Sequence, residues 1–78
     1  MEIKVISRSA AWVPGRPELA QRVQVVCIFE RDGARVSVTK HLHWMGKNYV
    51  GRGSGPTKLL VFPPGITSGA WKAERLAA

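Results

Sequence analysis

The chain has 78 residues, of which 12 are Lys or Arg and 5 are Asp or Glu, so its formal net charge is +7. A chain of this length makes one domain, residues 1–78, with a core small enough that we expect it to gain stability as a homodimer. A lone cysteine excludes an internal disulfide, and the spacing of the two His and one Cys excludes a closed zinc site, so we expect no metal and no cofactor.

Near the N-terminus, apolar and charged residues alternate over residues 2–7, which predicts a strand. No apolar run reaches the roughly 18 residues of a membrane span, and no signal-peptide pattern occurs, so we expect a cytoplasmic protein without a membrane partner. Residues 9–19 contain two prolines and a glycine. This composition predicts a turn or an extended loop without regular structure. Trp12 either packs on the core and anchors this loop or exposes its indole beside Arg16, and we expect it to pack.

The strongest signal is a long hairpin over Arg22–Met45, in which two β-rich runs flank Asp32-Gly33. A two-residue turn there pairs Arg31 with Ala34 and sets the whole register. On one face the register pairs Phe29 with Val36, Cys27 with Val38, Val25 with Lys40 and Val23 with Leu42. On the other face it pairs Glu30 with Arg35, Ile28 with Ser37, Val26 with Thr39, Gln24 with His41 and Arg22 with His43. The mostly apolar column stays intact only in this register, and Cys27 falls in it as a buried small hydrophobe.

Residues 46–57 are rich in glycine and carry basic side chains, with Lys58 directly after them. Glycine disfavours both helix and strand, so we expect a mobile loop whose backbone approaches phosphate closely. The pattern is not a Walker loop, because it lacks the Gly-Lys-Ser/Thr ending and leads into a strand. That strand is predicted at residues 58–62, before a Pro-Pro-Gly stop, and Ile66 continues the core beyond it. A short C-terminal helix that begins at Thr67 or Ser68 is also expected.

Charge is the main functional clue, because no acidic residue occurs from residue 33 to residue 73 while basic residues are spread through the same stretch. Such a field attracts polyanions, and nucleic acid is the first candidate. His41 and His43 lie two residues apart on one strand face, so they join Arg22 and Arg35 on a polar surface. Trp44 and Tyr49 bracket the start of the basic loop and are candidates for stacking on bases. The predicted nucleic-acid-binding residues are Arg22, Arg35, Lys40, His41, His43, Trp44, Lys47, Tyr49, Arg52 and Lys58.

Two other functions compete with this interpretation. A small RNA-cleaving toxin would use His41, His43, Lys47, Tyr49 and Arg52 for acid–base chemistry and phosphate stabilisation. Against catalysis, no carboxylate lies near these residues in the sequence, so we expect binding and no enzymatic activity. A small interaction protein of a phage or mobile element would instead use the basic face to inhibit a host protein with an acidic surface.

The predicted strands and tight turns favour a mainly β fold, a small curled sheet or barrel of OB-like or SH3-like character. In size and in its basic, β-rich character the chain resembles the small single-strand binding proteins of filamentous phages. No residue role is transferred from that family to this chain, because the two have no motif in common. The leading hypothesis is binding of single-stranded DNA or RNA through phosphate contacts and base stacking.

Overall fold

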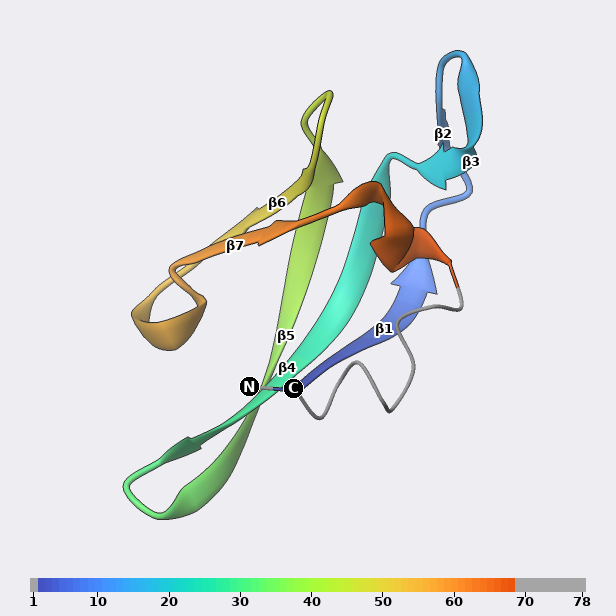
Figure 1. The fold of residues 1–78 in the computed structure, drawn as a ribbon. Helices are drawn as coiled ribbons and strands as arrows, with labels where there is room; N and C mark the ends of the chain where they lie inside the picture. Colours follow the sequence, from blue (N-terminus) through green and yellow to red (C-terminus); the bar gives the residue numbers. More distant parts are fainter. Residues whose placement is uncertain (1, 69–78) are drawn as a thin grey trace.

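The protein is built mainly from antiparallel β-strands, and its computed structural model describes residues 2–68. Five strands form one sheet in the order β1-β4-β5-β6-β7, and two short strands form a separate hairpin (Figure 1). The elements in chain order are β1 (Glu2–Arg8), β2 (Trp12–Val13), β3 (Arg16–Ala20), β4 (Arg22–Arg31), β5 (Ala34–Trp44), β6 (Tyr49–Arg52), the 3-10 helix η1 (Gly55–Thr57), β7 (Leu59–Phe62) and the 3-10 helix η2 (Pro64–Thr67).

The β4–β5 hairpin pairs along its whole length in the register predicted from the sequence. Its ladder runs from Arg22 opposite His43 to Arg31 opposite Ala34, and every pair between them is the expected one. Asp32 and Gly33 make the turn with φ of 52° and 77°, both positive as a type I′ turn requires. The hairpin is the centre of the sheet, because β1 pairs with β4 and β6 pairs with β5.

Alternation along the strands gives the sheet two different faces, which we call the inner face and the outer face. The inner face of β4 and β5 carries Val23, Val25, Cys27 and Leu42, all buried. These side chains belong to a core whose members are Ile3, Ala20, Val23, Val25, Cys27, Leu42, Tyr49, Leu60 and Ile66. The buried position predicted for Cys27 is therefore confirmed. The outer face presents the alternate residues of the same strands to solvent.

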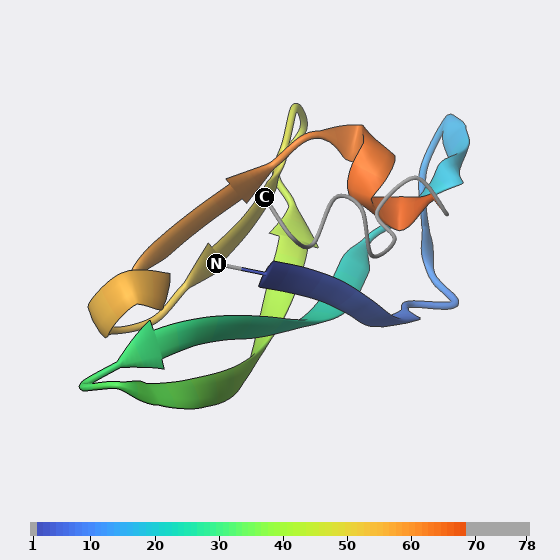
Figure 2. The same ribbon diagram turned by 60° about the horizontal axis from the view of Figure 1, so that its bottom comes forward.

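The sheet is strongly twisted and stays open. β6 and β7 cross the β4–β5 hairpin at an angle (Figures 1 and 2), and the edge strands of the sheet are β1 and β7. Within residues 2–68 no ladder joins these two edges, so the expected barrel is wrong and the curled sheet is the form that fits. η2 contacts both β1 and β3 and contributes the fully buried Ile66, so it covers one end of the core.

Residues 9–19, predicted to lack regular structure, instead contain the β2–β3 hairpin. Pro14 and Gly15 form its turn, with Gly15 at φ 77°, the combination found in type II turns. Pro17 lies within β3, which has only the two-residue β2 beside it, and a strand with an unpaired edge tolerates the missing N–H. The turn was predicted correctly, whereas the strands on either side of it were missed.

The glycine-rich segment 46–57 also contains more regular structure than the sequence predicted. It includes β6, which pairs with both β5 and β7, and the η1 helix. Gly51 lies on the inner face of β6, where an added Cβ would meet Leu42 Cδ2 at 2.5 Å and Leu60 Cβ at 3.8 Å. Glycine is used here because the Leu42 side chain fills the space that a Cβ would take.

The predicted strand at residues 58–62 is observed as β7, and Ile66 lies in the core as expected. Thr67 belongs to η2, and the C-terminal helix predicted beyond it lies outside the described residues. Across residues 2–68 there is no helix with the length and apolar character needed to cross a membrane.

Candidate functional site

Several of the predicted site residues meet on the outer face at the end of the hairpin away from its turn. Arg22 lies directly opposite His43, and Gln24 lies directly opposite His41. His43 in turn lies opposite Val50 of β6, and Arg52, two residues further along β6, shares the outer face. We call the group Arg22, His41, His43 and Arg52 the basic end. All four side chains are exposed.

The basic end lacks acidic partners. Among residues 2–68 the ion pairs are Arg16–Glu18, at 2.6 Å, and Arg35–Glu2, at 2.9 Å. The remaining described acids, Glu30 and Asp32, lie at or beside the hairpin turn, at the opposite end of β4. Charge is therefore segregated along the hairpin, and the positive field of the basic end is uncompensated by the described residues.

Two pockets open on either side of Arg22. The β1 pocket has a volume of about 360 Å³ and is lined by Ser7, Arg8, Ser9, Ala10, Arg22, Val23, Gln24 and His41. The hairpin pocket has a volume of about 230 Å³ and is lined by Val13, Pro14, Gln21, Arg22, His43 and Trp44. Arg22 is common to both linings, so this residue lies between two adjoining hollows.

Arg35 lies on the outer face but far from the basic end. It is eight positions from His43 on β5, which at about 3.3 Å per residue separates the two by roughly 26 Å. Its guanidinium donates to the Glu2 carboxylate at 2.9 Å. Arg35 was predicted to share a binding surface with Arg22, and the structure instead places it in a separate, charge-balanced region.

Lys40 points to the inner face, as its register position predicted, and its side chain ends at the segment before η1. An added Cβ on Gly53 would lie 1.8 Å from Lys40 Nζ, so the ammonium group packs directly against that glycine. The charge also reaches Cys27: burial raises the pKa of the Cys27 thiol, and Lys40 partly opposes that rise. Lys40 is therefore not part of the outer surface on which His41 lies.

Arg31 reaches the same segment from the hairpin turn, and no sequence pattern indicated this position. Its guanidinium lies 5.5 Å from the centre of the Phe29 ring, and its Nη2 would be 3.1 Å from an added Cβ on Gly55. The close approach of the hairpin to η1 depends on the sheet twist, which a strand pattern does not specify.

Tyr49 is fully buried, so its ring is not available to stack on a base. Its hydroxyl donates to the backbone oxygen of Ala20 at 2.5 Å. Burial raises the pKa of Tyr49, while a hydrogen bond with Thr67 and the charge of Arg16 oppose that rise. The stacking role predicted for Tyr49 does not fit this environment.

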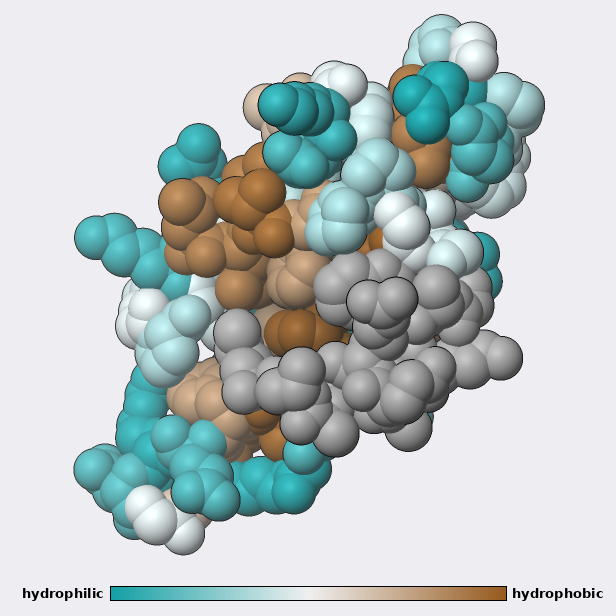
Figure 3. All heavy atoms as spheres, in the orientation of Figure 1, coloured by the Kyte–Doolittle hydropathy of each residue, from teal (hydrophilic) through white to brown (hydrophobic). Residues whose placement is uncertain are grey.

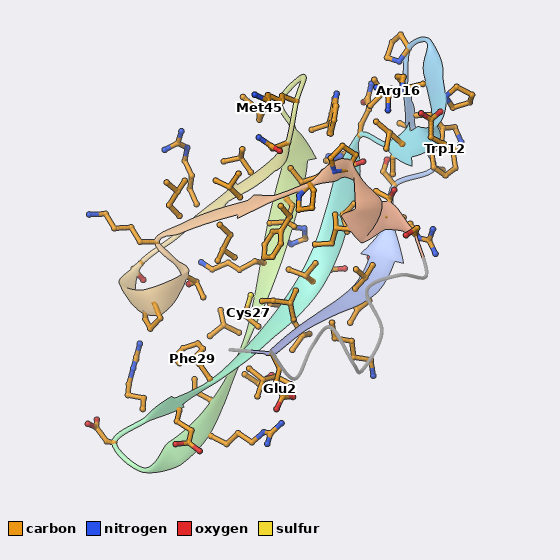
Figure 4. All side chains as sticks on the ribbon, viewed as in Figure 1. Glu2, Trp12, Arg16, Cys27, Phe29 and Met45 are labelled. Carbon is orange, nitrogen blue, oxygen red and sulfur yellow. The ribbon has the colours of Figure 1, made fainter. Side chains whose placement is uncertain are left out.

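Trp44 packs on the same core and is also among the residues that line the hairpin pocket. Its ring meets Tyr49 edge to face, with centroids 5.0 Å apart and planes at 61°. Trp12 was expected to pack, but it is 48% exposed on the β2–β3 hairpin, where Arg16 is also carried (Figure 4). In the sequence, the exposure of Trp12 was indicated only by the Pro-Gly turn, which makes this hairpin project from the sheet.

Lys47 of the glycine-rich segment and Lys58, which directly follows that segment, lie at opposite ends of the β6–β7 hairpin. Lys47 is exposed in the turn between β5 and β6, which is closed by a bond from the Met45 N–H to the Asn48 oxygen at 2.9 Å. Lys58 is exposed at the end of η1. Neither lines the pockets beside Arg22.

Comparison with protein-family models, with curated proteins and with solved structures finds no match to this chain. The same residues 2–68 contain no cluster of three His, Cys, Asp or Glu side chains able to hold a metal ion. The geometry and charge of the basic end are therefore the features that indicate a function.

Proposed function

We propose that this protein binds single-stranded nucleic acid along the outer face at its basic end. The observation that carries the proposal is that Arg22, His41, His43 and Arg52 are exposed on one sheet face without an acidic partner among the described residues. Cationic side chains spaced along a sheet contact successive phosphates, and release of counterions from the strand drives such binding. Single-stranded nucleic acid is met in the cytoplasm, where we place the protein.

A twisted sheet face is also a known type of surface for this task. OB folds bind oligonucleotides on a sheet face with the help of adjacent loops, and we group the curled sheet with such OB-like or SH3-like folds. Lys47 and Lys58, exposed at the two ends of the β6–β7 hairpin, extend the positive surface beyond the basic end.

Fluorescence anisotropy of labelled single-stranded DNA, single-stranded RNA and duplex, at low and moderate salt, tests this function. Each phosphate neutralised on a single strand makes the slope of log K against log salt more negative by about 0.7. Four such contacts, from Arg22, Arg52, Lys47 and Lys58, give a slope of roughly −3. We expect Arg22→Gln and Arg52→Ala to weaken binding and to reduce that slope. Arg35→Gln is the matched control, since Arg35 is paired with Glu2. Affinity that does not change with salt, or no binding at low salt, would contradict the proposal.

We propose binding rather than catalysis, because the residues of the endonuclease alternative do not converge. His41, His43 and Arg52 lie on the outer face, Lys47 lies in a turn and Tyr49 lies in the core. A general acid and base must both reach the scissile phosphate, and Tyr49 is fully buried. Labelled RNA incubated with the protein should remain intact on a denaturing gel, and cleavage that disappears in His43→Ala would contradict this choice.

A second candidate function, association with another protein chain, is favoured by a separate observation. Met45, Leu59 and Val61 are 66%, 57% and 52% exposed, and Figure 3 shows apolar side chains gathered over β6 and β7. Val61 lies opposite Val50 on the outer face of the β6–β7 hairpin. Apolar side chains clustered at one edge of a small domain are typical of a protein interface, and we propose a second copy of this chain as the partner.

Light scattering after size-exclusion chromatography tests the homodimer. We expect the wild-type mass to be that of two chains, and Val61→Lys to give one chain, with Thr39→Lys on exposed β5 as the control. A wild-type mass of one chain at all concentrations would overturn the homodimer. A host protein with an acidic surface, captured at fixed stoichiometry and lost in Val61→Lys, would then be the partner.

A further inference from the structure

We propose that Arg22 divides one nucleotide-sized site into two parts: the hairpin pocket takes an unpaired base, and the β1 pocket takes the adjoining phosphate. This inference rests on the proposed function and assigns the two chemical parts of a nucleotide to separate hollows. The observation behind it is that the two pockets share Arg22 and differ in the chemistry of their other walls.

The hairpin pocket has the walls that a flat heterocycle requires. His43 contributes an imidazole and Pro14 a saturated ring, both at exposed positions, while the neighbouring Trp44 directs its ring toward the core. Rings of this kind stack on any base, because every base has a π face. Gln21 adds an exposed side-chain amide at the rim, which offers both a donor and an acceptor to the edge of a base.

This pocket is held in place before any ligand enters. On the core side, the Trp44 ring meets the Tyr49 ring edge to face, with centroids 5.0 Å apart. The backbone N–H of Trp44 donates to the backbone oxygen of Gln21 at 2.8 Å, and the backbone N–H of Gln21 donates to the backbone oxygen of Ala11 at 2.9 Å. These bonds connect β5, the residue before β4 and the segment before β2, so little conformational entropy is lost in ordering the pocket when a ligand binds.

The β1 pocket has different walls, which suit a phosphate group. Arg22 and His41 supply donors, and no carboxylate is among its lining residues. Arg8 also borders this pocket, but it lies opposite inner-face Val23 and its guanidinium donates to the Thr67 backbone oxygen of η2. The backbone N–H of Ser9 donates to the Arg22 oxygen at 2.8 Å, which fixes this wall of the pocket. A forked guanidinium binds phosphate through more than one N–H, so an arginine beside the imidazole of His41 favours that anion.

Gln24 completes the polar lining with a fixed orientation. Its side-chain oxygen accepts a bond from Ser7 Oγ at 2.9 Å, which leaves the amide N–H₂ group free to donate to an anion.

The use of separate pockets for base and phosphate also explains a preference for single strands, because a base held in a duplex cannot enter the hairpin pocket. Single-strand binding then follows from pocket shape, whereas charge alone would attract duplex equally well.

The test compares three probes on the full chain: a short labelled oligothymidylate, the same sugar–phosphate strand without bases, and inorganic polyphosphate as a competitor. If one base stacks in the hairpin pocket, the oligothymidylate binds about tenfold more tightly than the abasic strand. His43→Ala and Gln21→Ala, both at exposed positions, should reduce that ratio toward one. Gln21→Ala, which lies outside the basic end and removes no basic side chain, should leave the affinity for polyphosphate unchanged. Arg22→Gln should weaken all three probes, and Arg35→Gln should weaken none.

The outcomes separate this inference from the proposed function. Equal affinity for the base-bearing and abasic strands would overturn the base pocket and leave nucleic-acid binding in place. A ratio that survives in both His43→Ala and Gln21→Ala would place the base elsewhere and also overturn the inference. If neither strand binds at low salt, the proposed function itself fails.

Discussion

The two faces of the β4–β5 hairpin use adjacent residues for opposite purposes. Leu42 is fully buried on the inner face, while His41 and His43 on either side of it are exposed on the outer face. The same alternation separates Val23 from Arg22 and Gln24 on β4. Because a strand directs successive side chains to opposite faces, we expect substitutions one residue apart to change stability and the proposed ligand binding independently.

The largest difference between the faces is expected for Leu42→Ala and His41→Ala. Truncation of a fully buried leucine leaves a cavity and costs about 2–5 kcal/mol of the free energy of unfolding, which is most of the stability of a domain this small. His41→Ala, on an exposed side chain, should change that free energy by less than about 0.5 kcal/mol. Urea denaturation followed by circular dichroism measures both, and equal losses in the two variants would show that the faces are not separate.

Gly51 and Arg52 allow the same comparison on β6. The added methyl group of Gly51→Ala would meet Leu42 Cδ2 at 2.5 Å, and overpacking of this kind costs about 1–3 kcal/mol. Arg52→Ala removes an exposed outer-face side chain, so unfolding should be nearly unchanged while affinity for a single strand falls. The urea midpoint measures the loss of stability expected for Gly51→Ala, and the anisotropy titration measures the loss of affinity expected for Arg52→Ala. A Gly51→Ala variant as stable as wild type would mean that the core relaxes around the new methyl group.

The separation into faces was predictable from the sequence, because it depends on local rules. Asp32-Gly33 sets a two-residue turn, and only one register then keeps the apolar column intact. The observed ladder has that register throughout. The same alternation correctly placed His41 and His43 beside Arg22, so the centre of the candidate site was also predicted.

What the sequence did not predict depends on contacts between distant segments. Gly51 was interpreted as a loop residue from its propensity, but the Leu42 side chain makes glycine necessary within a strand. Tyr49 was assigned to the surface for the same reason, and its burial follows from the formation of β6. The hairpin pocket joins β2, β4 and β5, and the docking of β2–β3 on the sheet is not encoded in any one-strand pattern.

Tyr49→Phe tests the inner face at the point where the buried Tyr49 hydroxyl meets the backbone. Loss of the bond to the Ala20 oxygen leaves a buried acceptor without its partner and should cost about 1–2 kcal/mol. The pKa of Tyr49 is raised by burial above its ordinary value of 10.0. The folded state then favours the protonated hydroxyl, so the associated stability is complete below that ordinary value and is lost as pH rises above it.

The difference in unfolding free energy between wild type and Tyr49→Phe should therefore shrink as pH is raised above about 10. Comparison of the two proteins in the same buffers cancels the deprotonation of lysines, which both share. Urea titrations on either side of that pH provide the measurement. A difference that grows in alkaline solution would mean that the folded state stabilises the ionised hydroxyl, contrary to the buried geometry.

The smallest effect is expected at Arg35, the outer-face arginine that has an acidic partner. Its guanidinium is 2.9 Å from Glu2, with side chains 66% and 39% exposed. Exposed ion pairs contribute about 0.2–1 kcal/mol and weaken with salt, so Arg35→Gln should lower the free energy of unfolding slightly at low salt and not at high salt. Because Glu2 already neutralises this end of the hairpin, single-strand affinity should stay the same. A loss of affinity in Arg35→Gln equal to that in Arg22→Gln would extend the binding surface along the whole outer face, and the separation between a paired end and an unpaired end would no longer hold.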